Sequence, residues 1–130
     1  VGGNELTDEH LASVGTVKSL RRLTFRTLGF TKFSDAGLAP LGKLANLREL
    51  RINGSTKVTN AGLVHLANLQ GLQKLDLGRT GITSACSATL GKLPDLEELE
   101  VVGSRFGPDG VDQLRKLNPK VRVILQRPLY

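Results

Sequence analysis

Hydrophobic residues recur along this chain with a period of about 25 residues. The segment 57–80, KVTNAGLVHLANLQGLQKLDLGRT, has apolar residues at three-residue steps and then an LxxLxL run, and similar segments lie before and after it. The hydrophobic residue that opens each copy is Leu6, Phe33, Val58, Ile82 or Phe106, so the spacings are 27, 25, 24 and 24 residues. A fixed period in the twenties with LxxLxL in each unit indicates stacked repeats.

The first half of each copy predicts a short helix. Apolar residues at Leu63, Leu66 and Leu69 suit a helix with one buried face. Four copies have a hydroxyl residue where a helix N-cap belongs, because its oxygen can accept a free amide hydrogen of the first turn. These residues are Thr7, Ser34, Thr59 and Thr83. Asp8 and Asp35 follow two of them, where the helix dipole favours an acid.

The second half of each copy predicts a strand, because apolar and polar residues alternate there with a period of two. The expected strands are 23–25, 50–52, 75–77, 99–101 and 121–123. Ser55, Thr80 and Ser104 stand three positions after the middle strands. We expect each of these hydroxyls to be buried and to hydrogen-bond the backbone of its turn.

Units of this size cannot cover their own apolar faces, so five of them should stack. We expect an α/β fold, a right-handed β-α superhelix of five repeats with a concave parallel sheet and convex helices. The repeat domain is expected over residues 6–125, with 1–5 as the remnant of an N-terminal cap and 126–130 as a C-terminal tail. Because little is available to cap the ends, we expect the chain to be a segment of a longer protein.

The segments LTDEHL, FSDAGL and VTNAGL, together with the LxxLxL strands, resemble leucine-rich repeat proteins. They are most similar to the "TDAGL" repeats of many bacterial proteins and are also similar to the cysteine-containing repeats of F-box substrate adaptors. The resemblance covers roughly residues 6–125. It implies a protein-interaction surface, most often concave, and no catalysis. The adaptor role does not carry over, because no F-box segment is visible and the cysteine position holds Ser or Thr.

Composition narrows the class of protein. The chain has 130 residues, a net charge of +6, 39% hydrophobic and 23% charged residues, which is typical of one soluble globular domain. No apolar run is long enough to span a bilayer, and residues 1–10 lack the features of a secretory signal. A single cysteine, Cys86, lends no support to an oxidising compartment, which favours an intracellular protein. We interpret Cys86 as a buried small residue.

The outward side chains of the expected strands should form columns on the concave sheet. The first column is Arg22, Glu49, Lys74, Glu98 and Lys120, the second is Thr24, Arg51, Asp76, Glu100 and Arg122, and the third is Arg26, Asn53, Gly78, Val102 and Ile124. Charge alternates along the first column, and opposite charges facing each other across a sheet stabilise its register. The column is therefore either a structural ladder or a charge-coded docking surface, and both interpretations stay open.

Asp76 and Glu100 are like charges that should lie side by side. Such a pair could hold Ca²⁺ or act as an acid and a base. No histidine stands beside it, and Arg51 and Arg122 flank it, so we favour a solvated patch buffered by arginines. The sequence predicts no catalytic residue, no metal site and no cofactor.

A set of cations, which we call the basic rim, should follow one edge of the repeats: Lys32, Lys57, Arg79 and Arg105. Such a stripe can attract polyanions. Binding of single-stranded nucleic acid also uses aromatic side chains, and Phe25, Phe33 and Phe106 all occupy buried repeat positions. Nucleic acid is therefore the less favoured partner.

The first copy is two residues longer than the second, and insertions in repeats often lie on the binding face. Phe30, in the extra segment 27–32, could anchor a partner or plug the end of the core. Our main hypothesis is a non-enzymatic module, a monomer or part of a larger chain, that binds a protein or peptide. Its candidate contacts are Arg22, Arg26, Phe30, Arg51, Asp76 and Glu100. The alternatives are polyanion binding through the basic rim and a structural spacer within a larger protein.

Overall fold

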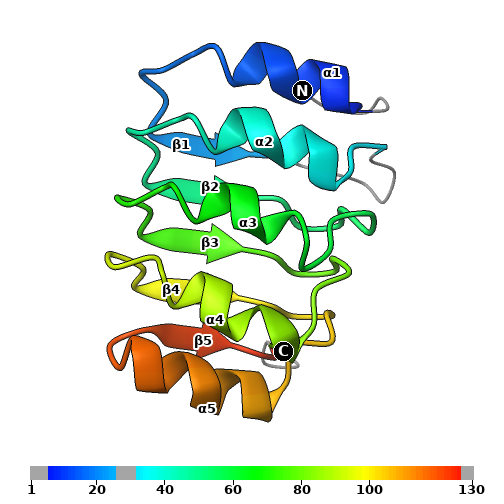
Figure 1. Ribbon diagram of the computed structural model, residues 1–130. Helices are drawn as coiled ribbons and strands as arrows, with labels where there is room; N and C mark the ends of the chain where they lie inside the picture. The colour runs from blue at the N-terminus through cyan, green and yellow to red at the C-terminus, as the bar shows by residue number, and fades with distance from the viewer. Residues whose placement is uncertain (1–5, 26–31, 127–130) are drawn as a thin grey trace.

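The computed structural model describes residues 6–25 and 32–126. Five parallel strands form one sheet, and their order in the sheet is their order in the chain. They are β1 (Arg22–Thr24), β2 (Glu49–Arg51), β3 (Lys74–Asp76), β4 (Glu98–Glu100) and β5 (Arg122–Ile124). Figure 1 shows the strands stacked one below another, each with its helix beside it. The predicted fold class is confirmed.

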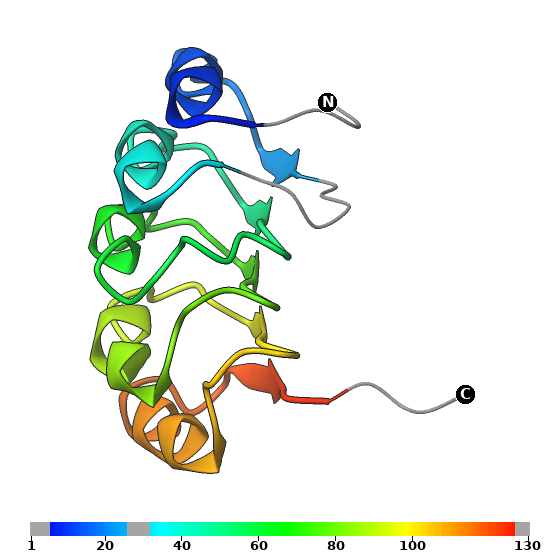
Figure 2. The same cartoon turned by 90° about the vertical axis from the view of Figure 1, so that its right-hand side faces the viewer.

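A helix lies between each strand and the next, and one precedes β1. The helices are α1 (Asp8–Val14), α2 (Leu38–Leu41), α3 (Leu63–Leu66), α4 (Ser87–Leu90) and α5 (Pro108–Leu117), with 3-10 turns at Asp35–Gly37 and Ser84–Cys86. Figure 2 shows the row of helices bowing outward and the sheet along the inner side of the curve. None of the described helices is long and apolar enough to cross a bilayer.

A ladder of leucines forms the core. Leu50 pairs with Leu75, and Leu75 with Leu99, on neighbouring parallel strands, and all three are at most 2% exposed. Stacking thus buries a face that no single repeat could cover. The stack ends are less covered, since Val17 and Leu117 are 46% and 57% exposed whereas Leu44, at the same repeat position, is fully buried.

The fifth strand is displaced relative to the other four. β1 to β4 each begin one residue earlier than predicted, whereas β5 begins one residue later. β5 spans Arg122–Ile124 instead of 121–123, and Val123, not Val121, pairs with Leu99. The period of 24 residues therefore continues to the end of the sheet. The strand was predicted too early because Val121 is apolar and looks like a buried strand residue. It is indeed 3% exposed, but it stands at the repeat position where the fourth repeat has the exposed Glu97.

This shift corrects the columns at their last member. Arg122 lies beside Glu98, and Ile124 lies beside Glu100. The predictions of Lys120 in the first column, Arg122 in the second and Ile124 in the third are therefore wrong. Charge still alternates along the first column, because Arg122 takes the place of Lys120 and both side chains are cations.

Two of the four predicted N-cap residues, Ser34 and Thr59, join repeats instead of capping their own helices. Ser34 donates from its backbone nitrogen and hydroxyl to the carboxylate of Asp8, at 2.7 and 3.0 Å. Thr59 donates in the same way to Asp35, at 2.6 and 2.5 Å. Thr83 accepts the predicted hydrogen bond from an amide of the turn that follows it, Ala85, at 3.2 Å. Thr7 forms a capping box with His10, whose Nδ1 accepts from the backbone nitrogen of Thr7 at 3.0 Å.

The same junction continues through the later repeats with other side chains. Asn60 accepts from the backbone nitrogen of Thr83 at 2.9 Å and donates to its hydroxyl at 2.7 Å. Ser84 accepts from the backbone nitrogen of Gly107 and donates to Asp109 at 2.8 Å. The hydrogen bond from Ser84 lowers the pKa of Asp109. A polar ladder thus runs along the N-terminal ends of the helices.

This ladder explains the glycine of the DAG motif. A Cβ atom on Gly37 would lie 2.6 Å from Oδ1 of Asp8, and one on Gly62 would collide with Asp35 in the same way. In the repeat that follows Asn60, this position holds Cys86. Cys86 is 1% exposed, as predicted, and burial raises the pKa of its thiol to about 12.

Two of the three predicted turn hydroxyls hydrogen-bond their turns as expected, although Ser104 is only half-buried. Thr80 donates to the carbonyl of Leu77 and Ser104 to that of Val101, each at 2.7 Å. Ser55 is fully buried, and its hydroxyl has no partner within residues 6–25 and 32–126.

Candidate partner-binding surface

The inner face of the sheet presents a column of alternating charge. Its members, in strand order, are Arg22, Glu49, Lys74, Glu98 and Arg122, and each is in register with the next. Arg122 Nη1 lies 3.7 Å from Glu98 Oε1. Pairs of this kind contribute about 0.2–1 kcal/mol each, so the column supports the register of the sheet.

Arg51 connects the first column to the second. Its Nε lies 3.6 Å from Glu49 Oε2, and its Nη1 lies 4.0 Å from Asp76 Oδ2. The side chain of Arg51 is still 34% exposed. Two carboxylates therefore hold the guanidinium in place while one side of it remains open to solvent.

Asp76 and Glu100 lie side by side as predicted, but they are not solvated. They are 6% and 5% exposed. Asp76 Oδ1 accepts hydrogen bonds from the backbone nitrogen of Gly78 at 2.9 Å and from Asn53 Nδ2 at 3.4 Å. Because the carboxylate of Asp76 binds donors of the protein itself, its role is to position Arg51 and the turn at Gly78. No cluster of three potential metal ligands is found in the described part of the chain.

A hollow of about 170 Å³ opens on the sheet over β3, β4 and β5. It is lined by Arg51, Lys74, Leu75, Glu98, Glu100, Arg122 and Ile124. Pockets for drug-sized ligands or cofactors typically hold about 300–1,000 Å³, so this hollow suits a single side chain of a partner. Its lining combines cations, carboxylates and the aliphatic side chains of Leu75 and Ile124.

Some of these lining residues could have been found from the sequence and others could not. Arg51 and Glu100 were candidates, and Lys74 and Glu98 were placed in the adjacent column. Ile124 was predicted on the same face but in the third column, because its strand was displaced in the prediction. A strict period of 24 residues after Ile82 and Phe106 is the signal that would have placed it beside Glu100.

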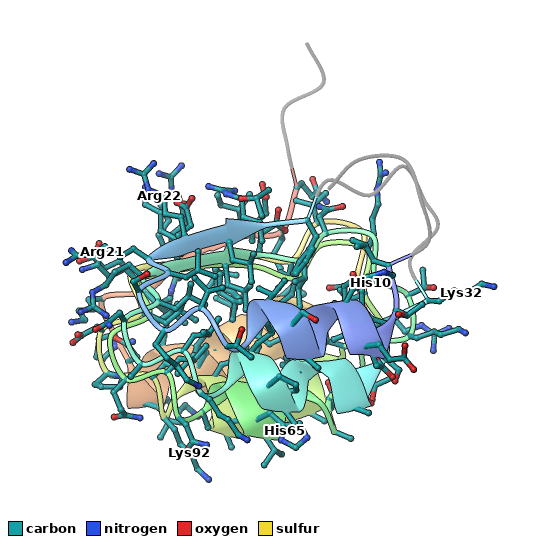
Figure 3. The ribbon with its side chains drawn as sticks, turned by 90° about the horizontal axis from the view of Figure 1, so that it is seen from above. His10, Arg21, Arg22, Lys32, His65 and Lys92 are labelled. Atoms are coloured by element: carbon teal, nitrogen blue, oxygen red, sulfur yellow. The ribbon has the colours of Figure 1, made fainter. Side chains whose placement is uncertain are left out.

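The basic rim lies at the edge where the chain leaves the sheet for the helices. Figure 3 shows Lys32 at the opposite edge of the molecule from Arg21 and Arg22. All four members of the rim are exposed. Lys32, Lys57 and Arg105 directly precede the residue that opens a repeat, where the fourth repeat has Gly81. These three residues therefore share one repeat position.

Arg79 occupies a different position from the rest of the rim. Its backbone is in the left-handed region with φ of 53°, and the equivalent residues of the neighbouring repeats are Gly54 and Gly103, with φ of 92° and 79°. A Cβ atom on Gly103 would lie 3.0 Å from Cγ of Arg79, so the arginine side chain extends over this glycine. A residue with a side chain is strained in this conformation.

Two candidate contacts, Arg26 and Phe30, lie outside the described residues. Arg22 is exposed at the N-terminal end of the sheet, one strand from Arg51. The structure thus brings Arg51, Asp76 and Glu100 together on neighbouring strands and places Arg22 at the end of the same face.

Comparison with solved structures identifies the fold. The chain superimposes on a chain of the Chaetomium Mex67:Mtr2 structure with a TM-score of 0.65 at 16% identity, covering 95% of this chain and 93% of that one. Internalin C2 of Listeria monocytogenes gives a TM-score of 0.58 at 21% identity, with coverages of 88% and 55%. A leucine-rich repeat protein of Leptospira interrogans gives 0.55 at 22% identity, with coverages of 86% and 33%.

The chain therefore has the leucine-rich repeat fold, and it spans only part of the two bacterial proteins. No protein-family model matches the sequence, and no curated protein matches it. At these identities the likeness establishes the fold and leaves the partner undetermined.

Proposed function

We propose that this chain is a non-enzymatic interaction module that binds a protein or peptide on the concave sheet. The observation that carries the proposal is the hollow over β3–β5, which combines charged groups of both signs with the half-buried aliphatic side chain of Ile124. Leucine-rich repeat folds present such an inner face because stacked repeats create an extended concave surface.

The geometry suggests how a partner would be held. Arg51 is fixed by Glu49 and Asp76 before binding, so less side-chain entropy is lost when a partner carboxylate meets its open side. Lys74 is exposed beside the hollow, and Ile124 offers an apolar contact in its lining. A partner segment that carries an acid next to an aliphatic residue would match these groups.

A site-specific crosslinking experiment tests this proposal. A photo-crosslinking amino acid at Lys74 should capture a defined partner from an extract of the source organism, whereas the same group at Lys92 should not. Lys92 projects from the helical side, away from the sheet (Figure 3). Equal capture at both positions would contradict binding on the concave sheet.

A pair of charge-reversed variants completes the test. Lys74→Glu/Arg122→Glu should abolish capture by a crosslinker placed at Thr24, an exposed residue of β1 in register with Arg51. Lys92→Glu/Lys116→Glu makes the same change in net charge and should leave capture intact. Thermal unfolding of both variants verifies that the fold is kept.

The basic rim supports a second candidate function, the binding of a polyanion. The observation in its favour is the conformation of Arg79. This arginine occupies a left-handed backbone position that the two neighbouring repeats fill with Gly54 and Gly103. Binding to heparin should then weaken steeply with salt and should fall in Arg79→Gly, whose backbone suits this position. Absence of binding at low salt would remove this candidate.

A further inference from the structure

A second charged surface lies at the edge where the strands begin, on the first two repeats. We call it the basic edge, and its members are Lys18, Arg21, Arg22, Lys43 and Arg48. Within the segments 15–22 and 42–49 the only acid is Glu49. The carboxylate of Glu49 lies 3.6 Å from Arg51, and one acid among these cations leaves the basic edge with a net positive charge.

Like charges are adjacent on this edge. The backbone nitrogen of Arg48 donates to the carbonyl of Arg21 at 2.7 Å, so the two arginines belong to neighbouring backbones. The repeat does not require a cation here, because the equivalent residues of the next two repeats are Gln73 and Glu97, joined by the same hydrogen bonds. The guanidinium of Arg48 donates to the carbonyl of Leu47 at 3.3 Å and lies beside Gly71 of the third repeat, which holds this cation on the same edge.

The cations of the basic edge remain available to a ligand. Lys18, Arg21, Arg22 and Lys43 are exposed, and none of them forms an ion pair with another described residue. Figure 3 shows Arg21 and Arg22 projecting outward at the edge opposite Lys32. This surface is therefore separate from the basic rim.

A second hollow, of about 330 Å³, lies on the same two repeats between the C-terminal ends of α1 and α2. It is lined by Ala12, Gly15, Thr16, Lys18, Pro40 and Lys43. Lys18 Nζ donates to the carbonyl of Gly15 at 3.1 Å, which holds this ammonium at the hollow. Two lysines thus line a hollow that has aliphatic and backbone walls.

The dimensions and composition of the basic edge favour a peptide over a nucleic acid. Segments 12–22 and 38–51 contain no aromatic residue on which a base could stack. The edge covers two adjacent repeats, whose strands are one step of about 4.8 Å apart, so a few residues of extended peptide cover it. A duplex is instead held through many phosphates along its length.

We propose that the basic edge binds an acidic polypeptide segment, with its carboxylates on Arg21, Arg22 and Arg48 and one side chain in the hollow between Lys18 and Lys43. This site is distinct from the concave surface of the proposed function. The two surfaces share Arg22, which lies at the N-terminal end of the concave face. The variants that separate them therefore leave Arg22 unchanged, so each surface can be inactivated alone.

Fluorescence anisotropy with a short, labelled peptide of Asp and Glu tests the site in the intact chain. The peptide should bind at low salt, and Arg21→Glu/Lys43→Glu should weaken binding by about tenfold or more, since attraction is replaced by repulsion. Lys92→Glu/Lys116→Glu is the matched control, because Lys43, Lys92 and Lys116 share one repeat position and the change in net charge is the same. The control should weaken binding less than about twofold.

Four results would overturn the proposal. They are no binding at low salt, an equal loss in the control variant, tighter binding of single-stranded DNA than of the peptide, and a comparable loss in Lys74→Glu/Arg122→Glu. The last result would place the peptide on the concave sheet. Circular dichroism of each variant verifies that its fold is intact, so that a loss of binding reports on the surface.

Discussion

Asp8 of the first repeat accepts two hydrogen bonds from Ser34 of the second, from the backbone nitrogen at 2.7 Å and from the hydroxyl at 3.0 Å. The same carboxylate lies where a Cβ atom on Gly37 would be placed. Asp8 therefore links two repeats, and it also explains why position 37 holds a glycine.

Removing Asp8 should reveal this coupling. We expect Asp8→Ala to lower the free energy of unfolding by about 1–3 kcal/mol, because a half-buried amide and hydroxyl lose their acceptor. Gly37→Ala should be destabilising in the wild-type chain. It should be much less destabilising when it is combined with Asp8→Ala, since the added methyl group then no longer meets a carboxylate. Urea denaturation of the four proteins measures the coupling. Strictly additive costs would contradict it.

Arg79→Gly should not destabilise the protein. Its φ of 53° costs a residue with a side chain about 1 kcal/mol, and glycine adopts this conformation freely. We expect a neutral or higher melting temperature. Gly103→Ala is the matched control, because it places a side chain at φ of 79° and 3.0 Å from Arg79, and it should lower the melting temperature. A clear loss of stability in Arg79→Gly would show that its side chain stabilises the fold more than its backbone strains it.

The thiol of Cys86 should make stability depend on alkaline pH. Burial raises its pKa from 9.0 to about 12, so the folded state retains a proton that the unfolded state releases. The contribution is fully present below pH 9 and is lost as pH rises from 9 toward 12. Wild type should therefore lose stability relative to Cys86→Ala over this range. Identical pH profiles for the two proteins would contradict this linkage.

Asn118 should anchor the last repeat. It is 6% exposed, and its Nδ2 donates to the carbonyls of Leu96 at 3.1 Å and Leu93 at 3.4 Å in the preceding repeat. Asn118→Ala leaves these carbonyls without their donor and should cost about 1–3 kcal/mol. Hydrogen exchange should show the largest loss of protection in β5, and the exposed Gln113→Ala should show none.

Much of the sheet was predictable because the repeat pattern is local. Leucines at a regular spacing place Leu50, Leu75 and Leu99 on equivalent strands, and parallel stacking then sets their register. The alternation of charge from Arg22 to Glu98 follows from the same period. Burial of Cys86 follows as well, since its repeat position faces the core.

The candidate site was only partly predictable, because its properties depend on how side chains of different repeats meet. The sequence identified Arg51, Asp76 and Glu100 as candidate contacts. It could not show that the carboxylates of Asp76 and Glu100 are buried while the guanidinium of Arg51 remains partly exposed to solvent. It also could not show where the surface is hollowed. Hollows depend on side-chain orientation across several strands, and no periodicity encodes that orientation.

The sequence by itself therefore determined the repeat, the order of the strands and the apolar spine, because each depends on residue spacing along one chain. Only the tertiary structure decided the burial of Asp76 and Glu100, the use of Ser34 and Thr59 as links between repeats, and the grouping of cations into the basic edge. The physical reason is the same in each case. These features are contacts between repeats, where hydrogen-bond geometry and steric fit select among partners that the sequence pattern leaves equivalent.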